Sequence, residues 1–156
     1  SDGMPSVILL RKIMENASNV DDAVEIIRQA DRSAPINLAM VDADNKSVIA
    51  ECTHNRVALR YPEKGLLFST NWFISQDMNP GNGDTRYVDM VKMAQEYYGR
   101  LDRETVIAIL RSVRIANINL QSMVISPKER MLYFASGSRN AANGDFRRID
   151  LKNYLK

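Results

Sequence analysis

The chain has 156 residues, 45% of them hydrophobic and 26% charged, which is enough apolar material for a folded core and excludes disordered or collagen-like proteins. Its 21 basic and 19 acidic residues give a formal net charge of +2 and are spread along the chain, so charge does not indicate nucleic-acid binding. No apolar run approaches the roughly 20 residues that span a bilayer. The single cysteine, Cys52, rules out an intrachain disulfide. We therefore expect a soluble chain without nucleic-acid partners or a membrane span; the compartment is not indicated.

The first half of the chain predicts two helices followed by four strands. Pro5 suits the first turn of a helix, because its missing N–H costs nothing there, and apolar residues recur at helical spacing as far as Ala17. Asn19 is a typical N-cap, and it precedes a second amphipathic stretch that ends near Asp31. Short runs with β-type composition then predict strands at residues 36–42, 47–51, 56–61 and 66–70.

The second half predicts two helices and then three strands. A loop rich in Asn, Gly and Pro covers residues 76–84, and we expect Gly81-Asn82-Gly83 to be a turn rather than a phosphate-binding loop. Helices are predicted from Asp84 to Gly99 and from Asp102, as N-cap, to Arg114. The strands are expected at residues 118–125, 131–135 and 146–151, the last after a Gly/Asn-rich stretch at 137–144. Because the strands follow one another directly, we predict antiparallel pairing and one domain of the α+β class over residues 1–156.

Two short motifs contain the candidate site residues. The predicted strand at residues 66–70 runs into the amide of Asn71 and the aromatic side chains of Trp72 and Phe73. Fifteen residues after Asn71, Arg86 lies in the first turn of a predicted helix, two residues after Asp84. Ordinary structural roles exist for each: a strand-end amide bonded to the backbone, an exposed helix residue, and an acidic helix cap.

Several motifs together resemble a known enzyme family. They are Asp2-Gly3-Met4-Pro5 with Arg11, the Asn71 strand, Asp84-Thr85-Arg86, and Asn119-Leu120-Gln121-Ser122-Met123-Val124 with its Pro127 hairpin. The combination resembles the later part of the N-terminal-nucleophile (Ntn) amidohydrolases. The nearest group is the penicillin acyltransferase-like one (acyl-coenzyme A:6-aminopenicillanic acid acyltransferases). Acid ceramidase-like and bile-salt-hydrolase-like enzymes are related groups of the same superfamily. The resemblance implies a four-layer αββα sandwich of antiparallel sheets and cleavage of linear C–N amide bonds by an N-terminal Cys that self-cleavage exposes.

The resemblance also implies roles for particular residues. Asn71 would help to hold the oxyanion of the tetrahedral intermediate, and Arg86 would be the active-site arginine that orients acidic or carbonyl groups. Trp72 and Phe73 would contact the acyl group, and Asp84 would either hold Arg86 or only cap the helix. The substrate would be a small N-acyl amide, and no cofactor is implied.

The sequence departs from the family in lacking the nucleophilic Cys and the Arg and Asp that follow it. We therefore expect the chain to be a C-terminal fragment of a larger enzyme. Alone it would be inactive, because the nucleophilic Cys would lie in an upstream segment. We also expect the fragment to self-associate through exposed sheet. Cys52 and His54 lie on one face of a strand, about 7 Å apart and beyond hydrogen-bond reach, so a buried structural Cys and a surface His are expected. One Cys and one His do not make a zinc site. The alternative is a non-catalytic binding or assembly module that keeps the Ntn scaffold.

Overall fold

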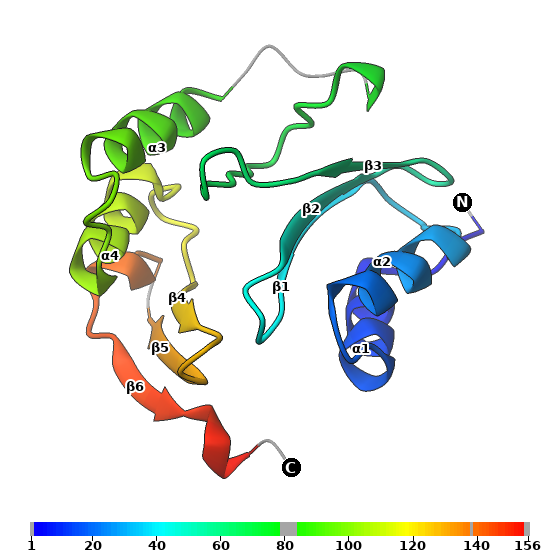
Figure 1. Cartoon of the computed structure of the whole chain (residues 1–156). Helices are drawn as coiled ribbons and strands as arrows, with labels where there is room; N and C mark the ends of the chain where they lie inside the picture. Colours follow the sequence, from blue (N-terminus) through cyan, green and yellow to red (C-terminus); the bar gives the residue numbers. More distant parts are fainter. Residues whose placement is uncertain (1, 79–83, 138, 155–156) are drawn as a thin grey trace. The chain divides into compact units, whose positions relative to one another are not determined.

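The computed structural model describes residues 2–78, 84–137 and 139–154, and it divides into two compact units. Unit 1 comprises Ser1–Asp84 and unit 2 comprises Thr85–Lys156. Each unit contains two helices and an antiparallel three-stranded sheet, so the predicted α+β class is confirmed (Figure 1). The predicted Gly81-Asn82-Gly83 turn lies outside the described residues.

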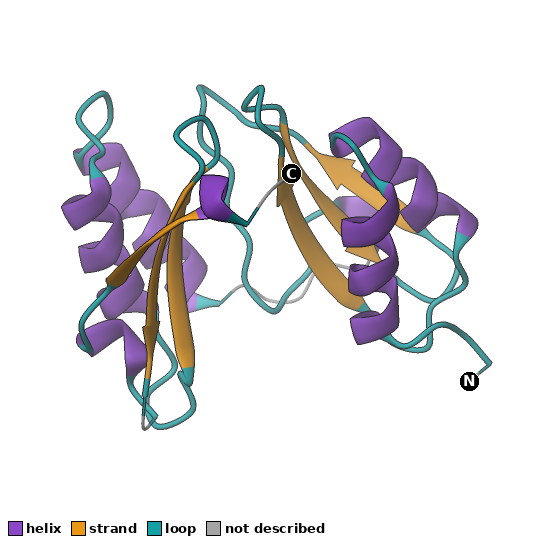
Figure 2. Ribbon diagram, turned by 90° about the horizontal axis from the view of Figure 1, so that it is seen from below, coloured by secondary structure: helices purple, strands orange, loops and turns teal. Residues whose placement is uncertain are grey.

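Unit 1 places both of its helices on the same face of its sheet (Figure 2). The first helix begins at Ser6, one residue after the predicted start at Pro5. The second begins after Asn19, as predicted, and the Asn19 side chain accepts a hydrogen bond from the Asp22 amide at 2.9 Å. The strands pair in the order β1-β2-β3. The bounds are α1 Ser6–Asn16, α2 Val20–Gln29, β1 Ile36–Val41, β2 Ser47–Cys52 and β3 Val57–Arg60.

The core of unit 1 lies between the helices and the sheet. Leu9 and Ile27 are fully buried there against alternate strand residues, among them Leu38, Ala50 and Cys52. Because successive side chains of a strand point to opposite faces, the residues between them point away from the helices. Ile49 and Glu51 of β2 are of that second kind and are also buried, so both faces of this central strand are covered.

Unit 2 has the same kinds of elements, with α4 packed on its sheet and α3 packed on α4. The predicted cap of α4 is confirmed, because the Asp102 carboxylate accepts from the Thr105 amide at 2.8 Å. The strands pair in the order β4-β5-β6. The bounds are α3 Thr85–Glu96, α4 Arg103–Val113, β4 Gln121–Ser126, β5 Met131–Ser136 and β6 Arg147–Asp150. Single 3-10 turns occur in both units: η1 Gln76–Met78 in unit 1, and η2 Ala141–Asn143 and η3 Leu151–Asn153 in unit 2. No helix of the described residues is long and apolar enough to cross a membrane.

The predicted strand at residues 66–70 is wrong. Only an isolated bridge between Glu63 and Leu66 forms, across a tight turn in which Lys64 and Gly65 have positive φ. Beyond it the backbone carbonyls of Phe68 and Thr70 accept hydrogen bonds from side chains, so no strand ladder forms. Asn71 therefore lies in a bend rather than at the end of a strand.

Two smaller boundaries also differ from the prediction. β4 begins at Gln121 rather than at residue 118, because Asn117 takes a positive φ of 67° in a turn that precedes the strand. The loop predicted from residue 76 opens with the single turn η1.

Candidate functional site

The candidate residues of unit 1 lie on residues 68–75, which we call the Asn71 segment. Asn71 and Trp72 are exposed, Trp72 by 51%, and Phe73 is half-buried. These three side chains are consecutive, so an amide and two aromatic rings are presented together on one irregular stretch of chain.

Each strand of unit 1 contributes one side chain that holds the backbone of this segment. Asn37 of β1 donates from Nδ2 to the carbonyls of Thr70 and Trp72, at 2.8 and 3.0 Å. Arg60 of β3 donates from Nη2 to the carbonyl of Phe68 at 2.7 Å. Glu51 of β2 accepts from the amides of Ile74 and Ser75, both at 2.9 Å.

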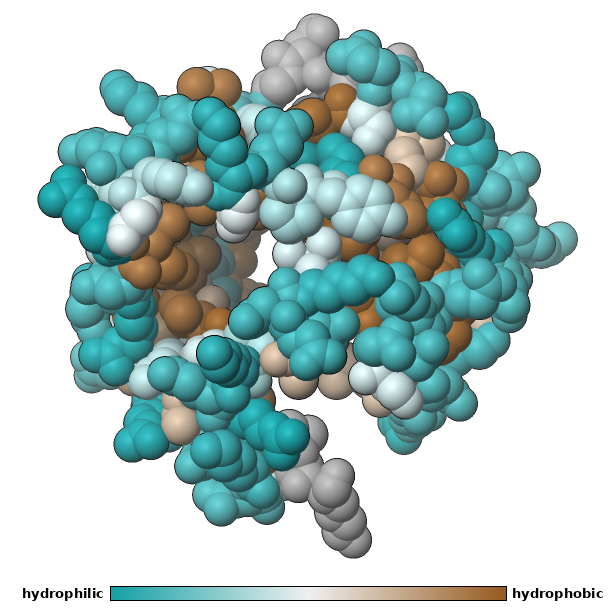
Figure 3. All heavy atoms as spheres, viewed as in Figure 1, coloured by the Kyte–Doolittle hydropathy of each residue, from teal (hydrophilic) through white to brown (hydrophobic). Residues whose placement is uncertain are grey.

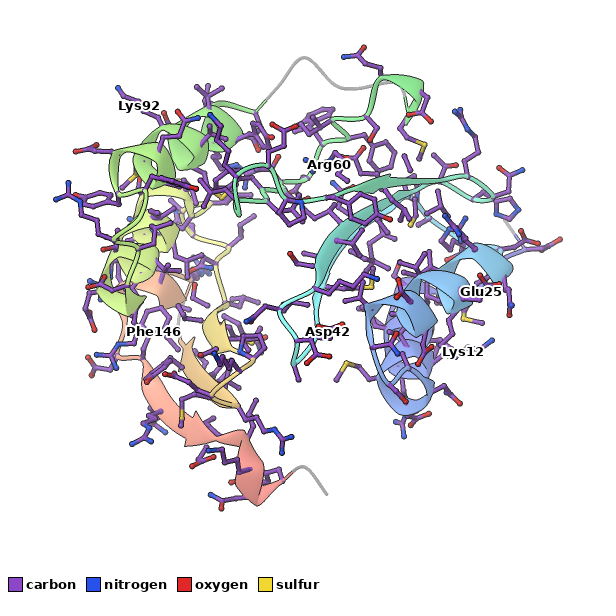
Figure 4. The ribbon with its side chains drawn as sticks, in the orientation of Figure 1. Lys12, Glu25, Asp42, Arg60, Lys92 and Phe146 are labelled. Carbon is purple, nitrogen blue, oxygen red and sulfur yellow. The ribbon has the colours of Figure 1, made fainter. Side chains whose placement is uncertain are left out.

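The strand register explains why these three side chains meet. Asn37 pairs directly with Glu51, and Arg60 pairs with Ile49, two residues before Glu51. All three therefore project from the face of the sheet that α1 and α2 leave uncovered. Arg60 is labelled on β3 in Figure 4, on the side away from the helices.

Glu51 is the electrostatic centre of this arrangement. Its side chain is 0% exposed and its Oε1 atom lies 2.6 Å from Arg60 Nε. Burial alone raises the pKa of Glu51, but the amide hydrogen bonds from Ser75 and Ile74 and the Arg60 charge outweigh it, so the net pKa is lowered. Glu51 is therefore held as a carboxylate, with both oxygens occupied.

Two polar atoms beside Asn71 are buried without a partner among the described residues. They are Asn37 Oδ1 and Thr70 Oγ1. A buried polar atom of this kind costs about 1–3 kcal/mol when it is left unpaired.

The candidate residue of unit 2, Arg86, borders a pocket of about 430 Å³. Arg86 lies in the first turn of α3, as predicted, and is half-buried. The pocket is lined by two arginines, Arg86 and Arg114, and by a largely apolar wall. The other lining residues are Leu110, Val113, Ile115, Ile118, Asn119, Gln121, Ser122 and Met123. Figure 3 shows hydrophobic atoms of unit 2 reaching a surface that is otherwise mainly hydrophilic.

Polar contacts hold one edge of this pocket. Arg114 donates from Nε to Asn140 Oδ1 at 3.4 Å and from Nη1 to the carbonyl of Arg111. Asn119 accepts from the amide of Ala142 at 2.7 Å and donates to the carbonyl of Gln121 at 2.9 Å. A positively charged pocket with an apolar wall suits a ligand that has a carboxylate or carbonyl group and an aliphatic portion.

The predicted site residues are therefore distributed over both units. Asn71, Trp72, Phe73 and Asp84 belong to unit 1, Asp84 as the half-buried residue directly before α3, and Arg86 belongs to unit 2. The sequence analysis did not identify the residues that surround them: Asn37, Glu51, Arg60 and Arg114. One signal was available, since Glu51 is a lone charge within the apolar run Val48-Ile49-Ala50-Glu51-Cys52.

Cys52 has the structural role that the sequence predicted. It is 0% exposed in the core of unit 1, and burial raises the pKa of its thiol. His54 is exposed, and its Nδ1 atom lies 2.6 Å from the carbonyl oxygen of Arg32. Within the part of the chain that the structure describes, no three His, Cys, Asp or Glu side chains are grouped to hold a metal ion.

Comparison with known proteins identifies the family. Curated proteins and solved structures gave no match to this chain. A family model described as acyl-coenzyme A:6-aminopenicillanic acid acyl-transferase matches residues 1–106, a stretch that includes both Asn71 and Arg86. The match covers more than half of the 156 residues and agrees with the resemblance seen in the sequence motifs. The chain belongs to the acyl-coenzyme A:6-aminopenicillanic acid acyl-transferase family.

Proposed function

We propose that this chain supplies Asn71 and Arg86 to the active site of a cysteine-dependent amide hydrolase or acyltransferase. The observation that carries the proposal is the family match, which includes both residues. The nucleophile comes from a segment outside this sequence, because the pKa of the Cys52 thiol is raised in the core, which disfavours the reactive thiolate. Alone, the chain is inactive.

In the proposed reaction the thiolate sulfur attacks the carbonyl carbon of an N-acyl amide. The carbonyl π electrons move to oxygen, and the Asn71 amide donates a hydrogen bond to the oxyanion that forms. When this intermediate collapses, the C–N bond breaks and the amine leaves with the proton that the thiol gave up when the thiolate formed. Water then releases the acyl group as an acid, or an amine accepts it as a new amide. Exposure of Asn71 on a backbone that is fixed on both sides supports this role.

Arg86 and its pocket supply the substrate-binding half of the proposal. The guanidinium is permanently charged and orients a carboxylate or carbonyl group of the substrate. The apolar wall from Leu110 to Met123 receives an aliphatic group. Trp72 and Phe73 contact the acyl group beside Asn71, and Asp84 supports the start of α3, which holds Arg86.

We also propose the family's four-layer αββα architecture for the active enzyme, of which this chain is the C-terminal part. Support comes from each unit taken by itself. Each has helices on one face of an antiparallel sheet, and side chains such as Ile49 in unit 1 and Ile125 in unit 2 project from the other face.

The test is expression of the complete gene, followed by N-terminal sequencing of the product and assays with N-acyl amino acids and 6-aminopenicillanic acid. The proposal requires a processed chain that begins with Cys, contains Asn71 and Arg86, and breaks or forms amide bonds. An unprocessed product without amidase or acyltransferase activity would favour the alternative, a binding or assembly module on the same scaffold.

A further inference from the structure

The Asn71 segment is held by side chains from three strands instead of by a strand ladder of its own. We propose that Glu51 is a positioning residue which, with Asn37 and Arg60, fixes the Asn71 side chain where the oxyanion develops. This inference rests on the proposed function of Asn71 and names the groups that make it effective.

The contacts of Asn37 restrict Asn71 most directly. One side-chain amide binds the carbonyl before Asn71, that of Thr70, and the carbonyl after it, that of Trp72, at 2.8 and 3.0 Å. The peptide group before the Asn71 α-carbon and the peptide group after the Trp72 α-carbon are thereby attached to β1. The two-residue stretch Asn71-Trp72 between these attachments has little freedom to shift while both bonds persist.

Glu51 and Arg60 hold the two ends of the segment and also each other. Arg60 binds the carbonyl of Phe68 at one end, and Glu51 binds the amides of Ile74 and Ser75 at the other. The Glu51–Arg60 ion pair at 2.6 Å joins these two attachments into one network. A shift at either end is therefore transmitted to the other through a single buried carboxylate.

The chemistry of Glu51 fits this role better than a role in stability alone. A buried charge has a large desolvation cost, and well-packed apolar residues often stabilise such a position equally well. An apolar side chain here would leave the amides of Ile74 and Ser75 without their acceptor and would release that end of the segment. A glutamine keeps the size but replaces one acceptor oxygen by a donor, so it satisfies only one of the two amides.

Trp72 reports directly on the segment, because it is the only tryptophan of the chain. In Glu51→Gln we expect stronger acrylamide quenching and lower fluorescence anisotropy of Trp72, at a temperature where circular dichroism shows an intact fold. Asn37→Ala gives the same change without altering the buried charge, and it tests the proposal if Glu51→Gln does not fold. Glu25→Gln is the matched control, since Glu25 is an exposed residue of α2. Unchanged Trp72 signals in the folded variants would overturn the proposed positioning.

Activity provides the second measurement, made on the processed product of the complete gene. A misplacement of about 1 Å costs about 10²-fold, so Glu51→Gln lowers kcat by about that factor while KM changes little. Glu25→Gln leaves both unchanged. Loosening of Trp72 with an unchanged kcat would overturn the positioning role, whereas full activity in Asn71→Ala would overturn the proposed function itself. The two failures are therefore distinguishable.

Discussion

Two neighbouring leucines of α1 occupy opposite environments. Leu9 is 0% exposed in the core of unit 1, and Leu10 is 43% exposed. Leu9→Ala removes buried methyl groups and leaves a cavity, so we expect it to lower the free energy of unfolding by about 2–5 kcal/mol. Leu10→Ala is the control, within about 0.5 kcal/mol of the parent chain. Urea denaturation measures both, and equal losses would contradict the burial of Leu9.

The carboxylate of Glu51 makes stability depend on pH. Its pKa in the folded chain lies below the ordinary value of 4.5, so the unfolded chain takes up a proton first as the pH falls. The stabilisation is complete above about pH 4.5 and is lost as the pH falls through the folded pKa. Glu51→Gln lacks this dependence and leaves the Arg60 guanidinium without its opposite charge, which costs about 3–5 kcal/mol. Unfolding curves between pH 7 and pH 3 would contradict the account if both proteins lost stability in parallel.

The sequence predicted individual residues best where a local signal was sufficient. The caps Asn19 and Asp102 and the burial of Cys52 follow from short-range patterns, and the structure confirms them. The contacts of Asn37 and Glu51 with the Asn71 segment join residues more than 20 positions apart, so no local pattern contains them. The assignment of Asn71 and Arg86 to catalysis remains a prediction.

At the scale of an element, α2 owes part of its stability to one capping side chain. Asn19 Oδ1 accepts from the Asp22 amide at 2.9 Å, which satisfies one of the free N–H groups at the helix start. We expect Asn19→Ala to cost about 1 kcal/mol, whereas Asn19→Ser retains a cap and costs a few tenths. Thermal unfolding followed by circular dichroism measures the difference; equal melting temperatures for the two variants would show that the cap contributes nothing.

Helices were easier to predict than the ends of strands. The periodicity of α1, α2, α3 and α4 placed each within about three residues of its observed bounds, because a long amphipathic pattern repeats its signal. Residues 66–70 have strand-like composition, but Arg60 and Asn37 take the carbonyls that a strand ladder would need. Side chains from distant strands therefore overrode a local preference.

At the scale of the whole molecule, exposed apolar side chains of the second sheet favour association. Met123 pairs with Phe134 and Ile125 with Leu132, which places these four on one face; Met123 and Ile125 are 47% and 53% exposed. We expect this chain to self-associate at micromolar concentration, because burial of such a face is favourable. Light scattering of Ile125→Lys would show weaker association than the parent chain. The control Val88→Lys, at an exposed position of α3, would associate as strongly as the parent chain. A strictly monomeric parent chain would contradict the prediction.

The class and the family could both be predicted from the sequence, for different reasons. Consecutive strands predict antiparallel pairing, which both sheets confirm, and several short motifs together were enough to indicate the family. The number of layers depends on contacts between elements far apart in the chain, which short-range patterns do not encode. The four-layer sandwich accordingly remains a proposal.

The most direct measurement compares amide hydrolysis or acyl transfer by the processed product of the complete gene with that of its Asn71→Ala variant. The account predicts that kcat falls about 10²- to 10³-fold, because the alanine cannot donate to the oxyanion. Asn16→Ala, at an exposed position of α1, is the matched control and keeps the parent rate. An Asn71→Ala enzyme as active as the control would contradict the central claim that this segment holds the oxyanion.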